Sequence, residues 1–520
     1  MACTEWQVFV SRSPPPECNH CARRNRRKPG RSLCEYDEVP RKRGPSKRLG
    51  GVHQVQDNED TSPSHAVSIR CPPACQPTNR SAKCHWAPLP FEPSLEFNRK
   101  SWWDDLLRIY SQDRHIALNK VVQDLRYLFE SSHHWMSLIN VTSFFVKLYD
   151  PLCREHLQPS VVLAALALSV LLQSGDDSHR TWGSKFALKL RTTAQSALEA
   201  SVNARWVDPS LAQAAYTLAL FETCTHPEYS ADRVISSFRS LDSIIAAYHL
   251  TCIDVDDANS SVFLPHAVPS VYPSRLSMAD ALDHLILVHS PKVTTCTCST
   301  FMASSLDLVS KSSGSPGWDP SWTSAEVQQE EIRRLCWNSL ELAAGHLGFT
   351  SASAHYVEDL TYVQPSKYGL LFPAETMYRS ELLGSPKESI WALLYRSMLL
   401  FRSCISRLRK KPAESEDEDD TLFAASAWAE VIAIQSNISG HVCSRESARA
   451  AFSTRILISE IVEKLPVKSN IKRAYALDRS SVEEWLQFHL ATGLFIEVWL
   501  ADPSRRKPYF IWLQMQLIDV

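Results

Sequence analysis

From about residue 96 onward, hydrophobic residues recur at intervals of three and four, which is the pattern of amphipathic α-helices. In SIWALLYRSMLLFRSCISRL (389–408) the spacing predicts one apolar helix face, formed by Ile390, Leu394, Met398, Phe401, Ile405 and Leu408. RVISSFRSLDSIIAAYHL (233–250) has a similar face, formed by Ile235, Phe238, Leu241, Ile245 and Tyr248. EEIRRLCWNSLELAAGHL (330–347) has another, formed by Ile332, Cys336, Leu340, Ala343 and Leu347.

Other stretches strengthen the expectation of a mainly α fold. VVLAALALSVLL (161–172) is apolar throughout, but it is shorter than the roughly 18 residues of a membrane span, so we expect a buried core helix. PSLAQAAYTLALFE (209–222) predicts a helix with Pro209 in its first turn. Convincing alternation of apolar and polar residues is missing, and there is no fixed-period repeat.

Composition divides the chain into four predicted parts. Residues 1–17 form a short lead-in, and 18–50 form a module rich in cysteine and basic residues. Residues 51–95 are rich in Pro, Ser, Asn and Gln, which predicts a flexible linker whose prolines would break a coiled coil. Residues 96–520 then form a large all-helical domain.

Two stretches interrupt the helical pattern. Residues 251–325 are rich in Ser and Pro, and we expect a partly ordered excursion there. KKPAESEDEDDTLF (410–423) carries six acids, which favours a solvated loop between helices. Its alternative interpretation is regulatory, because Ser415 precedes a run of acids of the kind that acid-directed kinases favour.

Charge and cysteine content add a local signal to this picture. The formal net charge of the whole chain is only −2, yet residues 21–50 hold eleven Lys and Arg against three acids. Such a basic segment indicates a polyanion-binding or nuclear-import arm, with a disordered basic tail as the alternative.

The fifteen cysteines, with no signal-peptide pattern at the start, favour a reducing compartment. We expect the isolated ones to be buried small side chains: Cys153, Cys224, Cys252, Cys336, Cys404 and Cys443.

The basic module also holds a cysteine pair with metal-ligand spacing. Cys18 and Cys21 are two residues apart, so their thiolates could share one tetrahedral zinc ion, and Cys34 follows in CEY. The remaining cysteine groups fit no zinc pattern as well. Cys71, Cys75 and Cys84 with His85 are interpreted as linker residues, and the CxC of Cys296 and Cys298 has no second pair nearby.

The stretch from Pro16 to Arg48 resembles the C-terminal half of the Zn(II)2Cys6 binuclear zinc cluster of fungal transcription factors. PECNHC, CEY and RKRGP stand where that family has its second CxxC, its last cysteine and its basic linker. The resemblance implies zinc as cofactor, held by Cys18, Cys21 and Cys34. It also implies DNA contacts from the basic residues Arg23, Arg24, Arg26, Arg27, Lys28, Arg41, Lys42, Arg43, Lys47 and Arg48.

The match is to an incomplete cluster. Six thiolates normally hold two zinc ions in this family, whereas only Cys3 precedes Cys18 here, and twelve residues separate Cys21 from Cys34. In a second alignment CNHCARRNRRK occupies the first half of the cluster, but the third ligand then falls near Lys28, which cannot bind zinc. A truncated gene model and a true loss of the first half both account for the pattern.

The helical region carries a second resemblance to the same family. Its regulatory middle homology region contains a recurring E-x-R-R-x-x-W-x-x-L helix, matched here by Glu331, Arg333, Arg334, Trp337 and Leu340. LQPSVVLAALALSVLLQSG and AQSALEASVNARWVDPSLAQAAYTLALFE also look like this region in mushroom-type fungi. No catalytic role follows from this resemblance.

Together the two resemblances imply a nuclear, DNA-binding regulator of RNA polymerase II transcription in a fungus. The implied partners are DNA with CGG-like half-sites, the transcription machinery or co-regulators, and a second copy of the chain in a homodimer. A membrane is not among the implied partners. The alternative is a helical regulatory or scaffold protein that has lost sequence-specific DNA binding.

An enzyme is not expected. The sequence lacks HExxH, GxSxG, GxGxxG and Walker-type motifs. His133-His134 and the stretches 249–257 and 353–360 supply His and carboxylates, which we interpret as surface polar residues and loops.

Overall fold

The computed structural model of the chain describes residues 93–174, 180–206, 208–224, 226–271, 317–349, 360–377, 385–409, 417–438 and 445–465, and scattered residues between 472 and 490. All described residues lie in one compact unit, Trp86–Val520. The predicted cysteine and basic module and nearly all of the predicted linker therefore lie outside the described residues, and the boundary predicted at residue 96 stays a prediction.

The described part is mainly helical, which confirms the expected fold class there. The α-helices are α2 (Pro93–Tyr110), α3 (Arg114–Ser131), α4 (Val141–Tyr149), α5 (Pro151–Arg154), α6 (Pro159–Gln173), α7 (Arg180–Asn203), α8 (Pro209–Thr223), α9 (Ala231–Ala247), α12 (Ser324–Phe349), α13 (Ile390–Arg409), α14 (Asp417–Ile438) and α15 (Arg445–Lys464). Short 3-10 helices are η2 (His133–Met136), η3 (Leu250–Cys252), η4 (Thr361–Val363), η5 (Pro365–Lys367) and η7 (Pro386–Glu388). Within the described residues, no helix is long and apolar enough to cross a membrane.

In the described part of the chain, two short strands accompany the helices. β1 (Ser261–Val262) and β2 (Gly369–Leu370) pair antiparallel, with Ser261 opposite Leu370 and Val262 opposite Gly369. β1 lies in the expected Ser/Pro-rich excursion, of which the structure describes 251–271 and 317–325.

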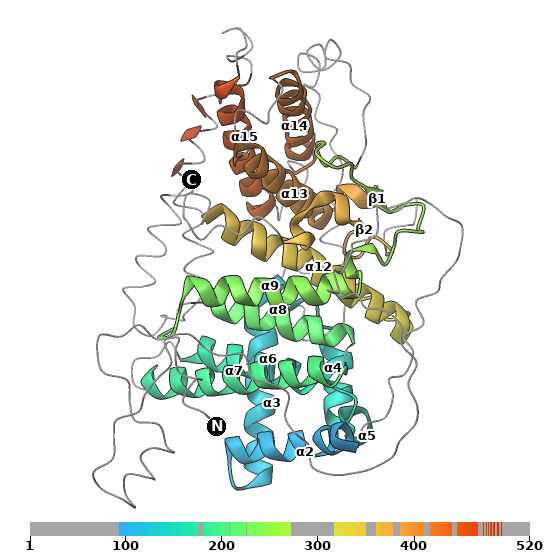
Figure 1. Cartoon of the computed structure of the whole chain (residues 1–520), viewed down its shortest axis with the longest axis vertical. Helices are drawn as coiled ribbons and strands as arrows, with labels where there is room; N and C mark the ends of the chain where they lie inside the picture. Colours follow the sequence, from blue (N-terminus) through green and yellow to red (C-terminus); the bar gives the residue numbers. More distant parts are fainter. Residues whose placement is uncertain are drawn as a thin grey trace, which may run out of the picture. The chain divides into compact units, whose positions relative to one another are not determined.

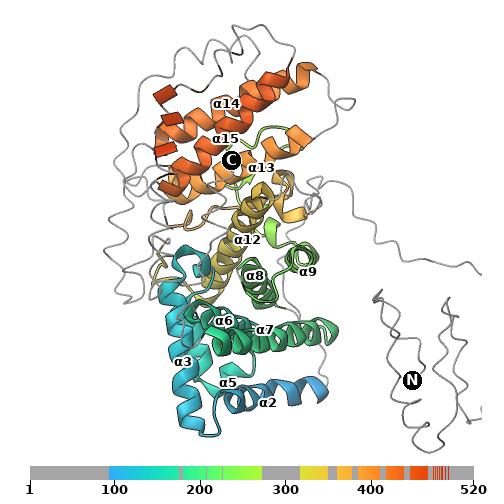
Figure 2. The same ribbon diagram turned by 90° about the vertical axis from the view of Figure 1, so that its left-hand side faces the viewer.

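The helices of this unit form a chain of neighbouring contacts that runs from α2 to α15. α2 and α3 pack together, α3 packs on α6, and α6 contacts both α7 and α8. α9 covers α8, and α12 lies between the α8–α9 pair and α13, as Figures 1 and 2 show. α13 then packs with α14 and α15. α12 thus connects the two groups of helices.

Local side-chain chemistry fixes where several helices begin. Asp113 and Asn140 cap α3 and α4 by accepting hydrogen bonds from backbone N–H groups of the first turn. Asp208 does the same for α8, with Pro209 in the first turn as predicted. At α12 the N–H of Thr323 donates to Glu326 (2.7 Å) and the N–H of Glu326 donates to the Thr323 hydroxyl (3.3 Å), which is a capping box.

The predicted core helices are largely confirmed. Every residue from Pro159 to Leu172 of α6 is buried, including the whole apolar run 161–172. Phe238, Leu241 and Ile245 of α9 are buried, and Ile235 and Tyr248 pack against the same core.

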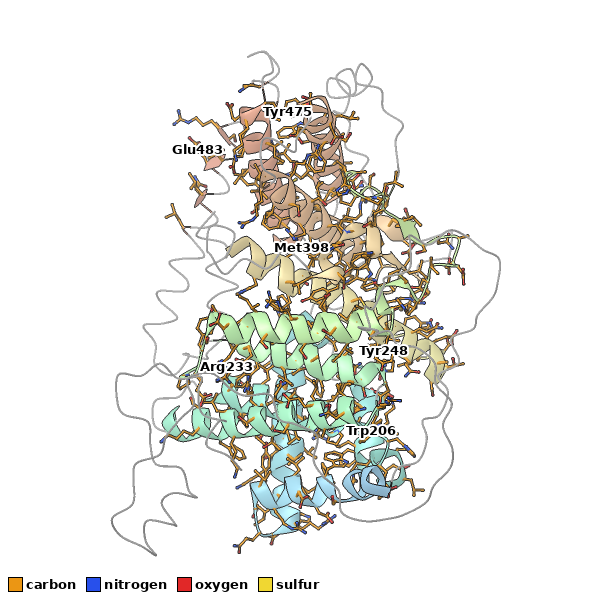
Figure 3. All side chains as sticks on the ribbon, viewed as in Figure 1. Trp206, Arg233, Tyr248, Met398, Tyr475 and Glu483 are labelled. Carbon is orange, nitrogen blue, oxygen red and sulfur yellow. The ribbon has the colours of Figure 1, made fainter. Side chains whose placement is uncertain are left out.

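The predicted helix at α13 is confirmed, but its apolar face only in part: Ile390, Leu394 and Ile405 are buried, whereas Phe401 and Leu408 are partly buried, and other faces of the helix are buried as well. Ala392, Tyr395 and Leu399 belong to the larger hydrophobic core, which extends through α2 to α12. Leu393 and Leu400, on another side of α13, belong to a second core shared with α14 and α15. α13 is therefore buried on two sides, and Met398, on its α12 side (Figure 3), is only partly buried.

The cysteine prediction holds in part. Cys224, Cys336 and Cys404 are buried, whereas Cys153 is exposed and Cys252 is half-buried. Cys153 lies on the short surface helix α5, where its thiol donates to an Asp150 carboxylate oxygen at 3.1 Å. The Cys252 thiol donates to the Lys367 carbonyl at 3.1 Å. Cys443 lies outside the described residues.

The acidic stretch is helical from Asp417 onward, so the prediction of a loop is wrong for that part. α14 already begins at Asp417, so the last acids of the run form its first turn. The guanidinium of Arg407 on α13, which is only 5% exposed, pairs with both Asp419 and Asp420. Acids at a helix N-terminus complement the helix dipole, which favours this helical start. Ser415 lies outside the described residues.

The start of α7 lies so close to the end of α6 that Gly183 has no room for a side chain. A Cβ atom at Gly183 would lie 2.8 Å from the Cβ of Ser174, which real structures do not tolerate without a shift. We expect Gly183→Ala to lower the free energy of unfolding by ~1–3 kcal/mol through overpacking, as measured by chemical denaturation.

Gly317→Ala is the matched control, because a Cβ there meets nothing within 4 Å. Equal stability of the two variants would contradict the close contact of α6 and α7.

Candidate functional site: the ionic centre of α12

The residues that the sequence predicts to bind zinc and DNA all lie within 18–48, outside the described residues. The structure therefore brings none of Cys18, Cys21, Cys34 or the ten basic residues into a described site. Among the residues that are described, no group of three or more His, Cys, Asp or Glu could hold a metal ion. The second predicted feature, the E-x-R-R-x-x-W-x-x-L helix, lies in the middle of the described unit as α12.

α12 is enclosed on every side over much of its length. All residues from Ile332 to Ala344 are buried, yet the helix also carries buried charges at Glu330, Arg333 and Arg334. Burying an ionised group is costly unless it is paired and hydrogen-bonded. The surrounding segments must therefore supply partners, and we call the resulting group of Glu330, Arg333, Arg334 and Asp254 the ionic centre.

Arg334 is held by groups from several directions. Its Nε donates to Glu330 Oε1 one helical turn earlier at 2.8 Å. Its Nη2 donates to the Gly317 carbonyl at 2.6 Å, and its guanidinium carbon lies 3.8 Å from the centroid of the Trp318 ring. That distance is within the range of a cation–π interaction. Arg334 thus fixes the segment that leads into α12 against the helix itself.

Arg333 forms a two-point pair with Asp254, a residue 79 positions earlier in the chain. Nε and Nη2 donate to the two carboxylate oxygens, each at 2.8 Å. Burial alone would lower the pKa of Arg333, but the hydrogen bonds and charge of Asp254, with Glu330, raise it. Asp254 also accepts a hydrogen bond from the Leu371 N–H at 3.0 Å. The prediction that carboxylates of the 249–257 stretch are surface residues is therefore wrong for Asp254.

Glu330 is the shared acceptor of the ionic centre and is fully buried. Besides Arg334, its carboxylate accepts from Arg333 Nη1 at 3.4 Å and from the Ala374 N–H at 2.7 Å. Ala374 has a φ of 59°, in the left-handed region that non-glycine residues seldom occupy. The hydrogen bond to Glu330 thus helps hold the backbone turn around Ala374 in this conformation.

Trp337 and Leu340 of the predicted motif face the core. The indole Nε1 of Trp337 donates to the Leu371 carbonyl at 2.8 Å. Its ring stacks on Phe372 at 4.7 Å between centroids and on Tyr395 of α13 at 5.4 Å. Leu340 is fully buried. The segment 371–374 is therefore joined to α12 by both hydrogen bonds and ring contacts.

The glutamate that the motif match selects does not belong to the ionic centre. Glu331 Oε1 accepts a hydrogen bond from the Asn140 N–H, at the start of α4, at 2.8 Å. Burial raises the pKa of Glu331, although the Asn140 bond and nearby cations oppose that rise. Glu330, one residue earlier, pairs with the two arginines. The signal for this was present, because Glu330 precedes them by three and four residues, the spacing at which helical side chains meet.

The chemistry of the ionic centre favours a structural role, in which the centre holds chain segments in position around α12. Its two acids and two arginines balance in charge, and each guanidinium is already engaged by carboxylates, carbonyls or a ring. A general acid or base must instead reach a reacting group and exchange a proton. The centre connects α12 to the segments around Asp254, Gly317 and Ala374.

Two further buried ion clusters serve helix contacts in the same way. Glu222 of α8 pairs with Arg191 of α7 and with Arg233 of α9, which Figure 3 labels. Burial would raise the pKa of Glu222, but His226 and the two arginines lower it overall. Arg396 of α13 donates to Glu430 of α14 at 2.7 Å, and Glu430 also accepts from the Ser270 hydroxyl at 2.7 Å.

Comparisons with models of protein families, with curated proteins and with solved structures found no match for this chain.

The ionic centre predicts a large cost for removing its shared carboxylate. Glu330→Gln leaves Arg334 buried without its ion-pair partner, so we expect the free energy of unfolding to fall by ~3–5 kcal/mol. Glu130→Gln, at an exposed helical position of α3, should change it by less than about 0.5 kcal/mol. Chemical denaturation of both variants tests the difference.

A double variant separates charge from packing. Glu330→Gln with Arg334→Met removes both charges of the pair, keeps a side-chain oxygen that can accept from the Ala374 N–H, and should be less destabilising than Glu330→Gln alone. A double variant that is less stable than Glu330→Gln would show that the charges of this pair stabilise the fold directly.

His346 of α12 predicts a pH dependence of stability. Burial lowers its pKa from 6.5 to about 4. Between these values the unfolded chain binds a proton that the folded chain excludes, so stability falls as the pH decreases from about 6.5 to 4. A change of this size corresponds to ~3 kcal/mol in total.

His346→Phe keeps a ring beside Phe238, whose centroid lies 5.2 Å from that of His346, but cannot titrate. The stability difference between wild type and variant should therefore change by about this amount between pH 7 and pH 4. A constant difference, measured by denaturation across that range, would contradict the assignment.

Proposed function

We propose that this protein is a nuclear, DNA-binding transcription regulator of the fungal zinc-cluster class. The observation that carries the proposal is the presence, in one chain, of Cys18, Cys21 and Cys34 within a basic segment and of the Glu-Arg-Arg-Trp helix farther along. In the proposal, Cys18, Cys21 and Cys34 bind zinc. The ten basic residues between Arg23 and Arg48 contact DNA phosphates.

The described unit supports the proposal through its architecture. It is mainly helical, as the family's regulatory region is expected to be, and the helix with the motif lies between two groups of helices. Arg333 and Trp337 bind segments 79 and 34 residues away in the sequence, and Arg334 binds the segment that leads into α12. A substitution or ligand that disturbed one of these segments would therefore act on several of them at once, which suits a regulatory domain.

In the proposed mechanism, affinity and specificity have different sources. Arginine and lysine side chains that neutralise phosphates release counterions, which gives salt-dependent binding to any DNA sequence. Reading CGG-like half-sites requires side chains held in a groove by a folded module. Zinc would supply that order to a segment too small to form a core of its own. Partners in the nucleus would be the transcription machinery or co-regulators, and a homodimer would engage two half-sites.

A second candidate function is a helical regulatory or scaffold protein without sequence-specific DNA binding. The observation that favours it is the number of thiolates. Three cysteines stand in the matched segment where the family's two-zinc cluster uses six. Such a protein would act through partners of its helical region and would bind DNA, if at all, through charge alone.

Zinc content of the purified full-length chain tests the metal part of the proposal. We expect bound zinc, measured by elemental analysis, that falls when Cys18, Cys21 or Cys34 is replaced by Ser. Cys153→Ser is the matched control, because Cys153 is an exposed cysteine outside the module. A chain that binds no zinc, or loses it equally in the control, refutes the metal site.

DNA binding of the full-length chain separates the two candidates. The first predicts tighter binding to CGG-containing duplexes than to scrambled ones, whereas the second predicts no preference. Replacing Arg23, Arg24, Arg26, Arg27 and Lys28 by Gln should reduce the slope of log K against log salt by up to ~4.5, about 0.9 for each phosphate contact. The control is a five-fold replacement at exposed helical positions, Lys120, Arg126, Lys185, Lys189 and Arg239. An equal change of slope in the control would assign the binding to the helical unit instead.

A further inference from the structure

The strand β2 is hydrogen-bonded to a second segment besides β1. The Gly369 carbonyl accepts a hydrogen bond from the Asp254 N–H at 3.1 Å. The Leu371 N–H donates to a carboxylate oxygen of Asp254 at 3.0 Å. β2 therefore lies between β1 and the segment around Asp254, which leaves β1 at the edge of this small sheet.

The register of the two strands shows which way the backbone of Val262 points. In an antiparallel pair, the N–H and C=O of one residue point to the same side, and those of the next residue point to the other side. The bonds of Gly369 and Leu371 lead to the second segment, so the N–H and C=O of Leu370 face β1. Leu370 is opposite Ser261, and these two residues form the hydrogen-bonded pair. The N–H and C=O of Val262 therefore point away from β2, and among the described residues neither has a partner outside the ladder of β1 and β2.

The side chains along β1 alternate between the core and the solvent, as the period of a strand requires. Ser261 and Phe263 are buried, whereas Val262 is 68% exposed and Leu264 is 66% exposed. A turn then ends the extended segment, because the Ala267 N–H donates to the Leu264 carbonyl at 3.4 Å. Residues 261–264 thus present two apolar side chains to the solvent.

Val255 lies on the same face of the sheet as these two side chains. Gly369 is opposite Val262, so a side chain at Gly369 would lie on the same face as that of Val262. A Cβ atom at Gly369 would be 3.2 Å from the Cβ of Val255, so Val255 covers the position that the glycine leaves open. Val255 is itself 53% exposed. We call Val255, Val262 and Leu264 the edge face.

An open strand edge beside apolar side chains suits one more extended segment. The unpaired N–H and C=O groups of an edge strand can pair with the backbone of a further strand, and the apolar side chains beside them contact the side chains of that strand. Recognition of this kind relies on backbone hydrogen bonds. It therefore selects an extended shape with apolar side chains at alternate positions rather than one particular sequence.

The size of this surface distinguishes a peptide from a second copy of the chain. A stable dimer buries about 800 Å² on each partner, contributed by about 20–30 residues. Within the described part of the chain, the extended edge comprises residues 261–264, and the exposed residues near the edge face in the sequence, Asp256, Asn259 and His266, are polar. The surface is therefore large enough for a short extended peptide and too small for a stable dimer.

We propose that the free edge of β1 binds a short extended peptide of another protein by β-strand addition. The Val262 N–H donates to a peptide carbonyl, and the Val262 carbonyl accepts from a peptide N–H. Branched apolar side chains at alternate positions of the peptide pack on the edge face. This binding site is independent of the proposed DNA and zinc binding.

Val262→Pro in the full-length chain tests the proposal. The substitution removes the outward N–H and leaves the ladder to β2 intact, because an edge strand tolerates proline where its N–H side faces solvent. The probe is a fluorescently labelled peptide in which threonine and valine alternate between terminal lysines. We expect saturable binding to wild type, measured by fluorescence anisotropy, and binding at least about tenfold weaker to Val262→Pro. The midpoint of thermal unfolding should stay unchanged.

Three controls separate backbone pairing from other effects. Val262→Thr keeps the N–H and the branched shape, so it should bind the peptide nearly as wild type does. Leu264→Gln should weaken binding, whereas Val146→Gln, at a valine of α4 that is 62% exposed, should not. The same peptide with N-methylated backbone amides cannot pair with a strand and should not bind.

The proposal is overturned if wild type does not bind the peptide or if Val262→Pro binds it equally well. A large fall of the thermal midpoint in Val262→Pro would place the Val262 N–H in the ladder with β2 and would also refute a free edge. Analytical ultracentrifugation tests the other occupant. A wild-type dimer that Val262→Pro converts to a monomer would assign the edge to a second copy of the chain and refute a peptide partner.

Discussion

The carboxylate of Glu330 is the group on which the arrangement around α12 depends. It is fully buried, so its charge is tolerable only because two guanidinium groups and a backbone amide surround it. Each of these partners is itself bound to another segment, Arg333 to Asp254 and Arg334 to Gly317 and Trp318. One buried charge therefore specifies the positions of segments that are far apart in the sequence.

Sequence periodicity was sufficient for elements whose burial follows a simple pattern. α6 is apolar on all sides and is buried on all sides, and the stripe along α9 faces the core as its spacing of three and four requires. α13 shows where periodicity fails. Its most regular stripe suggested one face, but the helix separates two cores, and residues such as Leu393 fill the second. A stripe indicates that a face is buried, but it cannot show that the opposite face is buried too.

The ionic centre could be predicted only in part. The spacing of Glu330 and Arg334 is local, and it could have been read from the sequence. The partnership of Arg333 with Asp254 could not, because nothing in a single sequence indicates which of many acids will meet a given arginine after folding. The burial of the isolated cysteines could also be predicted only in part. It was predicted correctly for Cys336 but not for Cys153. Cys336 occurs within a long periodic helix, whereas Cys153 lies on a four-residue helix at the surface. The predicted zinc ligands remain a statement about sequence alone.

The position of α13 between two hydrophobic cores has a consequence for how the molecule unfolds. Its buried side chains contribute to both hydrophobic clusters, and its buried Arg396 and Arg407 pair with acids of α14. Neither cluster can be dissolved while the other keeps its full set of contacts, because the same backbone carries part of each. The two groups of helices should accordingly behave as one cooperative folding unit. Backbone amides of α13 would then exchange with solvent only when that whole unit opens, and no hinge would be located there.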